Sequence, residues 1–228
     1  MEALLAFAAA LVSLRLSADL VRRYRKRRAP ELLIWAMALG AFAAGSGALA
    51  WGAAAGWDNA SFRVYYLFGG LLAAALLGAG SLLRVGVRWI GPLTLVYVGL
   101  AVGIVIAMPL TATVSGTSIP EAQAYLNLFP ARVVAIVANS IGTLAAVTVA
   151  LMGLRRRPLG NALILAGLLV AAIGSALAGL GEAESALFSA AAALLLYAGF
   201  VIPTPSVKSR PASEPRADAR PGPAGAAP

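Results

Sequence analysis

The sequence predicts an all-α membrane protein, built as a seven-transmembrane-helix bundle. Three observations predict this fold class: the 228 residues are 61% hydrophobic, only 12% are charged, and the charges cluster between long apolar runs. Average soluble proteins are roughly half apolar and a quarter charged. A run of about 18 apolar residues is long enough to cross the hydrocarbon core of a bilayer. The chain contains seven such runs.

Each run is expected to form a helix, because backbone polar groups in lipid must be hydrogen-bonded within their own segment. The alternating pattern of a transmembrane barrel is absent. The first run is expected to be retained as a helix, since basic residues follow it instead of preceding it as they do in a cleavable signal peptide. The expected helices span about 3–21, 31–55, 61–83, 87–109, 131–154, 160–181 and 184–203.

The placement of the basic residues predicts that the N-terminus is outside and the C-terminus is in the cytoplasm. If the first loop is cytoplasmic, so are all but three of the 18 Lys and Arg residues, the exceptions being Arg15, Arg63 and Arg132. Cytoplasmic loops of membrane proteins carry such an excess of Lys and Arg. The net charge of +9 therefore indicates orientation in a membrane. We expect no nucleic-acid partner, because no contiguous basic face with stacking groups is visible.

Two segments are expected to lie outside the spans. A short outer-surface helix is predicted at about 119–129, where Ser118 to Glu121 form a capping-box pattern and Ala122, Tyr125, Leu126 and Phe129 share one face. We expect this helix to cover the bundle. Residues 204–228 form a basic, Pro/Ala-rich tail with little to bury, and we expect this tail to be disordered and cytoplasmic.

Small residues recur at every fourth position in several of the expected helices. Helices associate within lipid through close packing of such residues, so these stripes predict contacts within the bundle, with a membrane protein partner or in a homo-oligomer. An Ala- and Gly-rich chain also produces such stripes by chance. The stripes are Gly40, Ala44, Ala48 and Gly52; Gly167, Ala171, Ser175 and Gly179; Gly70, Ala74 and Gly78; and Gly99, Gly103 and Ala107.

Polar residues at membrane depth are the first functional candidates, because charge there is expensive. Arg15 and Asp19 are four residues apart near the inner end of the first helix. One interpretation is a gating or proton-linked pair. The other is a neutralised pair whose Arg side chain extends toward the cytoplasm. Asn139 and Thr143 form a polar stripe in the fifth helix. This stripe predicts either a solute path or hydrogen bonds between helices.

A second group of candidates is expected at the outer surface. Asp58, Arg63 and Tyr66 cluster between the second and third helices, and Arg132 begins the fifth. One interpretation is an aromatic belt with an exposed Asp58–Arg63 ion pair. The other is a pocket for an anionic or polar ligand, roofed by the outer loop.

Residue types that are missing exclude many chemistries. The chain has no Cys and no His, and neither Lys26 nor Lys208 lies in an expected span. Retinal binding, His-ligated haem, His/Cys zinc sites and Ser–His hydrolysis therefore lack their key groups. We expect a protein that is not an enzyme and that binds no cofactor or metal.

Several motifs resemble a group of small, uncharacterised multi-helix membrane proteins of high-GC bacteria. The resemblance covers about the first 90 residues and is carried by Pro30–Trp35, Gly56–Trp57, Arg63–Gly70 and Leu76–Ser81. It implies a bacterial plasma (inner) membrane protein that crosses the membrane several times, and it implies no activity.

Two hypotheses of function follow. The first is a non-enzymatic protein that acts through protein or lipid contacts, as a scaffold, accessory subunit or sensor, and it predicts a closed, dry bundle. The second is a small-solute carrier or channel with a 3+1+3 helix layout like that of SWEET-type carriers, although their Pro-Gln motif is missing. It predicts a water-accessible cavity near mid-membrane, lined by Asn139, Thr143, Tyr97 or Thr94.

Overall fold

The computed structural model describes residues 1–179 and 185–202, except for the side chains of residues 175–179 and 185. All regular elements of this part are helical, and its one β-type pairing is an isolated antiparallel bridge between Leu110 and Leu126. The elements in chain order are α1 (Glu2–Arg27), α2 (Pro30–Ala55), α3 (Asn59–Tyr65), the π-helix η1 (Tyr66–Leu72), α4 (Ala73–Arg84), α5 (Ile90–Ala107), α6 (Ala122–Tyr125), the π-helix η2 (Leu128–Arg132), α7 (Val133–Met152), α8 (Pro158–Gly179) and α9 (Ser185–Val201).

The helical fold class predicted from the sequence is confirmed. Within the described residues, five segments are long and apolar enough to cross a membrane: Glu2–Arg27, Pro30–Ala55, Asn59–Arg84, Ile90–Ala107 and Leu128–Met152. The last two expected spans appear as the shorter apolar segments Pro158–Gly174 and Ala186–Val201. The predicted tail at 204–228 lies outside the described residues.

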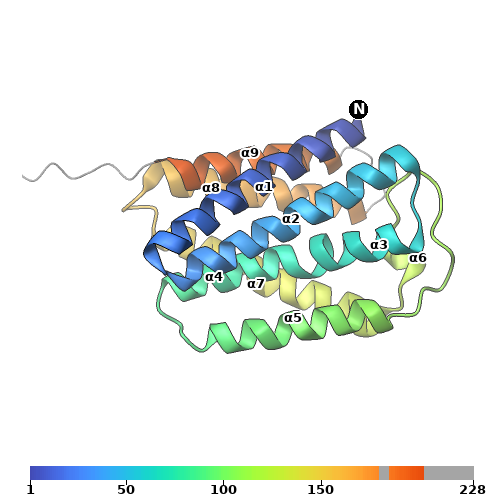
Figure 1. The fold of residues 1–228 in the computed structure, drawn as a ribbon, viewed down its shortest axis with the longest axis horizontal. Coiled ribbons are helices and arrows are strands. Elements are labelled where there is room, and N and C mark those ends of the chain that lie inside the picture. The colour runs from blue at the N-terminus through green and yellow to red at the C-terminus, as the bar shows by residue number, and fades with distance from the viewer. Residues whose placement is uncertain (180–184, 203–228) are drawn as a thin grey trace, which may run out of the picture.

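The long helices run side by side, with α5 at one edge and α1, α8 and α9 at the opposite edge (Figure 1). Contacts join them in the order α8, α9, α1, α2, α4 and α7. This series forms an arc, because α7 contacts α8 much less than it contacts α4. Helix α5 lies outside the arc, against α4 and η1.

Helix ends follow the local sequence. Pro30 opens α2, where its missing N–H costs nothing, and Glu31 places a negative charge beside the positive end of the helix dipole. Gly56 ends α2 with φ of 92°, a conformation that favours Gly. Asp58 then starts α3 with a capping box, in which its side chain accepts from the Ser61 N–H.

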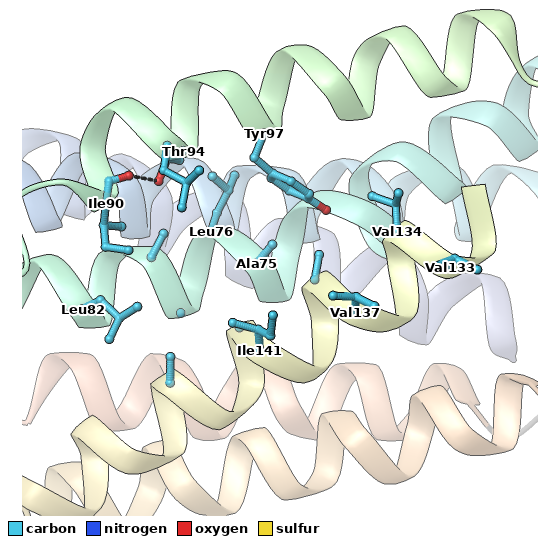
Figure 2. Close-up of a pocket in the computed structure, with 16 residues that line it drawn as sticks. Ala75, Leu76, Leu82, Ile90, Thr94, Tyr97, Val133, Val134, Val137 and Ile141 are labelled. Carbon is cyan, nitrogen blue, oxygen red and sulfur yellow. Dashed lines mark hydrogen bonds between the residues drawn. The ribbon is translucent and has the colours of Figure 1, made fainter. Parts of the chain in front are cut away.

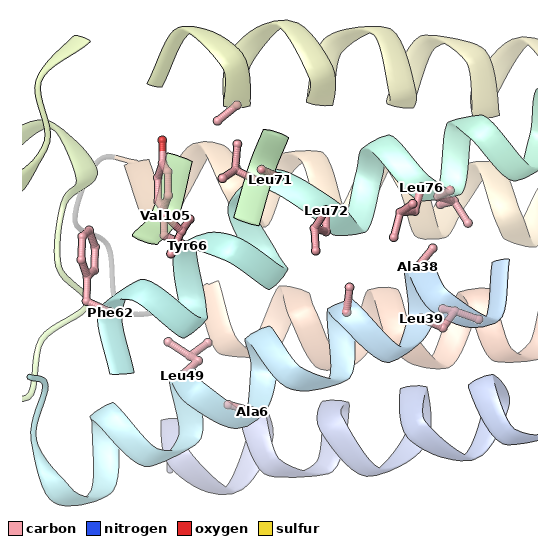
Figure 3. Close-up of a cluster of buried hydrophobic side chains, with 14 of the residues drawn as sticks. Ala6, Ala38, Leu39, Leu49, Phe62, Tyr66, Leu71, Leu72, Leu76 and Val105 are labelled. Carbon is pink, nitrogen blue, oxygen red and sulfur yellow. The ribbon is translucent and has the colours of Figure 1, made fainter. Parts of the chain in front are cut away.

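The buried core lies between α2 and the α3–η1–α4 segment. Phe62 and Leu71 are completely buried, and Figure 3 shows Leu49 of α2 between α2 and the α3–η1 segment. Aromatic packing at the outer end of this core adds an edge-to-face contact of Trp57 with Tyr65, whose ring centroids are 5.4 Å apart.

The closest helix–helix contacts are made by small residues, as expected. Some of these residues belong to the predicted stripes and others do not. A Cβ on Gly78 of α4 would meet the backbone of Gly142 of α7, and one on Gly45 of α2 would lie 2.9 Å from the Gly69 nitrogen. A Cβ on Gly40 would lie 3.4 Å from the Ser17 Oγ of α1, which is an ordinary van der Waals distance.

The other predicted stripes behave differently from one another. Gly52 lies under the Trp57 ring instead of a helix, and Gly167 meets Leu196 of α9. A Cβ added to Gly99 or Gly103 of α5 would meet no neighbouring atom within 4 Å. The packing around Ser175 and Gly179 lies outside the described part.

The loop between α5 and α7 packs against the junction of α2 and α3, but the predicted helix at 119–129 is wrong in its extent. Within this range only the four residues of α6 are α-helical, no side chain caps their N-terminus, and the π-helix η2 begins at Leu128. The loop is held by other bonds: Val114 N–H donates to Asn59 at 2.9 Å, and Trp57 N–H donates to the Gly116 carbonyl at 2.7 Å. Phe129, expected on the packed face, is 76% exposed.

Candidate functional site

The outer-face residues are brought together differently from the expected arrangement. The Arg63 guanidinium donates to the carbonyl oxygens of Val105 and Met108, the latter at 2.8 Å. These carbonyls are at the C-terminal end of α5, where helices leave acceptors unpaired and carry partial negative charge. Arg63 therefore caps α5, and the predicted Asp58–Arg63 ion pair is wrong.

Asp58 has its own role as the N-cap of α3. Its carboxylate accepts from the Ser61 N–H and from the Ser61 hydroxyl, both at 2.7 Å. Hydrogen bonds from the Ser61 backbone and side chain lower the pKa of Asp58, because they favour the charged form.

Tyr66 and Arg132 complete the outer cluster. Tyr66 is buried in η1, and Arg132 is half-buried just before α7. Neither Arg63 nor Arg132 lines any of the three cavities described below. The anion pocket expected between them is therefore not among these cavities.

The Arg15–Asp19 pair is also wrong. Asp19 lies 3.6 Å from Arg22, three residues along α1, while Arg15 is exposed and forms no ion pair within the described part of the chain. A residue three positions along a helix is as near as one four positions along, so sequence spacing alone left both partners open. The Asp19–Arg22 pair is partly exposed and has the character of a surface ion pair.

The polar residues at mid-membrane converge on the π-helix. Asn139 of α7 donates its amide N–H to the Gly70 carbonyl at 2.7 Å, and the Tyr97 hydroxyl of α5 donates to the Leu71 carbonyl at 2.7 Å. A π-helix shifts the backbone hydrogen-bond register, so two neighbouring carbonyls of η1 can accept side-chain donors from opposite sides. Asn139 thus joins helices, as one of the two predictions for it stated.

Sequence reasoning did not predict the π-helix or the role of Tyr97. The Gly69-Gly70 pair inside an apolar run was the available signal, since glycines weaken a helix and leave carbonyls accessible. The Asn139 Oδ1 atom remains buried without a hydrogen-bond partner in the described part of the chain.

One cavity, the α5 groove, lies between α4, α5 and α7 (Figure 2). Its volume is about 420 Å³. Thr94 and Tyr97 are on its wall, but both hydroxyls donate to backbone carbonyls, of Ile90 and Leu71 respectively. The remainder is aliphatic: Ala75, Leu76, Gly78, Ala79, Leu82, Ile90, Leu93, Val133, Val134, Val137, Ala138, Ile141, Gly142 and Ala145.

A second cavity, the mid-bundle cavity, has a volume of about 460 Å³ and lies inside the arc. It contains the predicted pair Asn139 and Thr143, together with Ser140. The two predicted pairs are thus separated, since Thr94 and Tyr97 line the α5 groove. The rest of its lining is apolar: Ala38, Leu39, Phe42, Gly69, Ala73, Ala74, Leu77, Leu144, Val147, Leu168, Ala171, Ala172 and Leu196.

A third cavity, the basic cavity, has a volume of about 560 Å³ and lies at the end of the bundle where α4 and α7 finish and α2 and α8 begin. Sequence reasoning missed it, because its charged residues come from three distant segments and each looked like an ordinary helix-end residue. Its lining is Glu31, Trp35, Leu77, Ser81, Arg84, Val85, Ala146, Val149, Ala150, Met152, Gly153, Arg156, Arg157, Asn161, Ile164 and Phe200.

The chain matches no protein-family model, no curated protein and no solved structure. Among the described residues, no group of three or more Asp or Glu side chains is placed to hold a metal ion.

Proposed function

We propose that this chain is a non-enzymatic membrane protein that acts through contacts with lipid or with another membrane protein, as an accessory, scaffold or sensor component. In this proposal its seven helices cross a bacterial inner membrane with the N-terminus outside and the C-terminus inside. Five long apolar segments support the membrane location.

The observation that carries the proposal is the way mid-membrane polar groups are used. The Asn139 amide N–H and the Tyr97 and Thr94 hydroxyls donate to backbone carbonyls of the protein itself. A path for a polar solute needs polar groups free to replace the water around it. The lining around these groups is mostly apolar, with Ser140 and Thr143 beside Asn139 as the other polar side chains, which favours lipid or helix contacts over passage of a polar solute.

The expectation of a closed bundle does not hold, however. The mid-bundle cavity has a volume of about 460 Å³, and two of its lining residues, Ser140 and Leu144, are exposed on the outer surface of α7. The exposed surface of these two residues faces the region that lipid chains occupy when the apolar helices span a bilayer. Lipid contact is therefore the form of the proposal that fits best.

Cysteine accessibility tests the proposal cleanly, because the chain has no Cys of its own. We expect Thr143→Cys and Ser140→Cys to resist a membrane-impermeant maleimide in proteoliposomes. Ser118→Cys in the exposed outer loop should react, and Leu95→Cys, which is 74% exposed on the apolar α5, should not. Labelling at 143 from the aqueous phase would overturn the lipid-contact proposal.

The same reagent tests orientation on intact cells. Ser118→Cys should be labelled from outside, while Val85→Cys, in the exposed turn after α4, should be labelled only after the cells are opened. The opposite pattern would reverse the proposed topology.

A small-solute carrier or channel is the second candidate. The specific observation in its favour is that Asn139, Ser140 and Thr143 line one cavity, with the unpartnered Asn139 Oδ1 buried beside it. Water-phase labelling of both Thr143→Cys and Ser140→Cys would support this candidate.

A further inference from the structure

The basic cavity concentrates positive charge at one end of the bundle. Arg84, Arg156 and Arg157 line it, whereas Glu31 is the one acidic side chain among the residues that do so. Asn161, in the first turn of α8, is also on the wall, so the partial positive charge of a helix N-terminus adds to the same field.

Two of the three lining arginines, Arg84 and Arg157, are held by contacts within the protein. Arg157 donates to the Ile202 carbonyl at 2.6 Å, and Arg23 donates to the Phe200 carbonyl at 3.3 Å, so both act on the last turn of α9. The Arg84 guanidinium lies over the Trp35 ring, 5.7 Å from its centroid. Positioned side chains lose less conformational entropy on binding than free ones do.

These like charges are close enough to oppose one another. Burial, then the charges of Arg84 and Arg23, lower the pKa of Arg157. An anion in the cavity would relieve this repulsion. The C-terminal tail does not supply a net negative charge that could neutralise these arginines. Its basic residues outnumber its acidic ones, since it carries Lys208, Arg210, Arg216 and Arg220 against Glu214 and Asp218.

The floor of the basic cavity is apolar and leads toward mid-membrane. Ala146, Val149 and Met152 line it, and Leu77 lines both this cavity and the mid-bundle cavity. Together the two cavities offer a cationic end and a mostly apolar continuation inside the arc. Leu144, which lines the mid-bundle cavity, is 70% exposed on the surface of α7.

We propose that the basic cavity binds the phosphate group of an anionic phospholipid, with Arg84 and Arg156 as its ligands and with an acyl chain extending past Leu77 into the mid-bundle cavity. Basic pockets between transmembrane helices are suited to such headgroups. The inference rests on the proposed function in its lipid-contact form, and it adds a site, a ligand class and the residues that select it.

Lipid titration of the purified full-length chain in neutral detergent tests this site, with native mass spectrometry measuring the bound fraction. Dioleoylphosphatidylglycerol should bind more tightly than dioleoylphosphatidylcholine, whose headgroup has no net charge. We expect Arg156→Gln to weaken phosphatidylglycerol binding by about threefold to tenfold, and Arg84→Gln to act similarly.

Matched variants separate the cavity from general surface charge. Arg155→Gln removes the same charge from the neighbouring residue, which is exposed like Arg156 but does not line the cavity, and should leave the affinity unchanged. Glu31→Gln removes the negative charge from the lining and should tighten binding by about twofold to threefold. Equal affinity for the two lipids, or equal losses in Arg155→Gln and Arg156→Gln, would overturn the proposal.

A separate titration distinguishes lipid from free phosphate. Inorganic phosphate should displace phosphatidylglycerol only weakly, because it makes no use of the apolar floor. If inorganic phosphate alone binds, with the same dependence on Arg156, the lipid source is overturned. The proposed function fails by a different result, the aqueous labelling of Thr143→Cys, so the two failures are distinguishable.

Discussion

The amide nitrogen of Asn139 lies 2.7 Å from the carbonyl oxygen of Gly70, and this bond joins α7 to the π-helix in the middle of the third span. Tyr97 reaches the next carbonyl, that of Leu71, from α5. The π-helix therefore does not break the bundle, because the backbone acceptors that it makes available are occupied by side chains from two neighbouring helices.

Replacing Asn139 by Leu should destabilise the bundle by about 1 kcal/mol, since hydrogen bonds between helices in membranes contribute roughly that amount and the Gly70 carbonyl would lose its side-chain donor. Reversible unfolding in mixed micelles measures the change. Thr143→Val, in the same cavity, is the control and should have a smaller effect. If Asn139→Leu is as stable as the parent, the bond has no structural value.

Tyr97→Phe removes only the hydroxyl that bonds to Leu71, and we expect a loss of about 1 kcal/mol. Tyr65→Phe is the matched control, because the structure shows no hydrogen bond from the Tyr65 hydroxyl and its ring contact with Trp57 is retained. Melting curves in detergent compare the two variants. A larger effect of Tyr65→Phe would contradict the assignment.

Gly78→Ala should be costly, because its new methyl group would meet the backbone of Gly142, which has no flexible end to move aside. Overpacking of this kind costs about 1–3 kcal/mol. Gly99→Ala is the control, since nothing lies within 4 Å of that position and Ala is the better helix former. The measurement is the unfolding free energy of both variants, and equal values would refute the α4–α7 contact.

Arg63→Gln should loosen the end of α5 by about 1 kcal/mol, because it removes a charged donor from the carbonyls of Val105 and Met108. Hydrogen exchange of the residues following α5 reports the local opening. Arg132→Gln removes the other outer-face arginine and should leave this region protected. Faster exchange at the end of α5 in Arg132→Gln alone would reverse the assignment.

Acid should weaken the start of α3. The pKa of Asp58 is lowered in the folded protein by its bonds with Ser61. Its contribution to stability is therefore fully present above the pKa of the unfolded chain and is lost as the pH falls through the lower, folded-state pKa. Asp58→Asn keeps a capping oxygen without a titrating charge, so its melting temperature should change less over the same acid range. Identical pH profiles would rule out this contribution.

The positions of the helices were largely predictable, but the pairing of their charged residues was not. Hydropathy predicted a span over 31–55, and the structure has the helix Pro30–Ala55, so the predicted start differs by one residue. Such agreement is expected, because the length of an apolar run in lipid follows the thickness of the bilayer. In contrast, Asp58 and Arg63 have opposite charges five residues apart, yet Asp58 bonds to Ser61 and Arg63 to the end of α5. Unpaired backbone groups competed for both side chains, and a sequence does not show which helix end comes near.

The outer loop shows the same limitation. Ser118 and Glu121 have the spacing of a capping box, but the Trp57 N–H, which donates to the loop backbone, and the Asn59 side chain, which accepts from it, fix a mostly irregular path. Local preference in a short segment is weak, so tertiary contacts decided its conformation.

The sequence by itself determined that this chain is helical and apolar enough for a membrane, because composition and run length act locally along the chain. It also identified Asn139 as a polar residue needing a partner. Only the tertiary structure decided what that partner is, and only the structure brought Arg84, Arg156 and Arg157 together around one cavity. The physical reason is that those contacts depend on which helix faces pack together, and in lipid that choice is made by close packing of small residues such as Gly78 and Gly142 rather than by hydrophobicity.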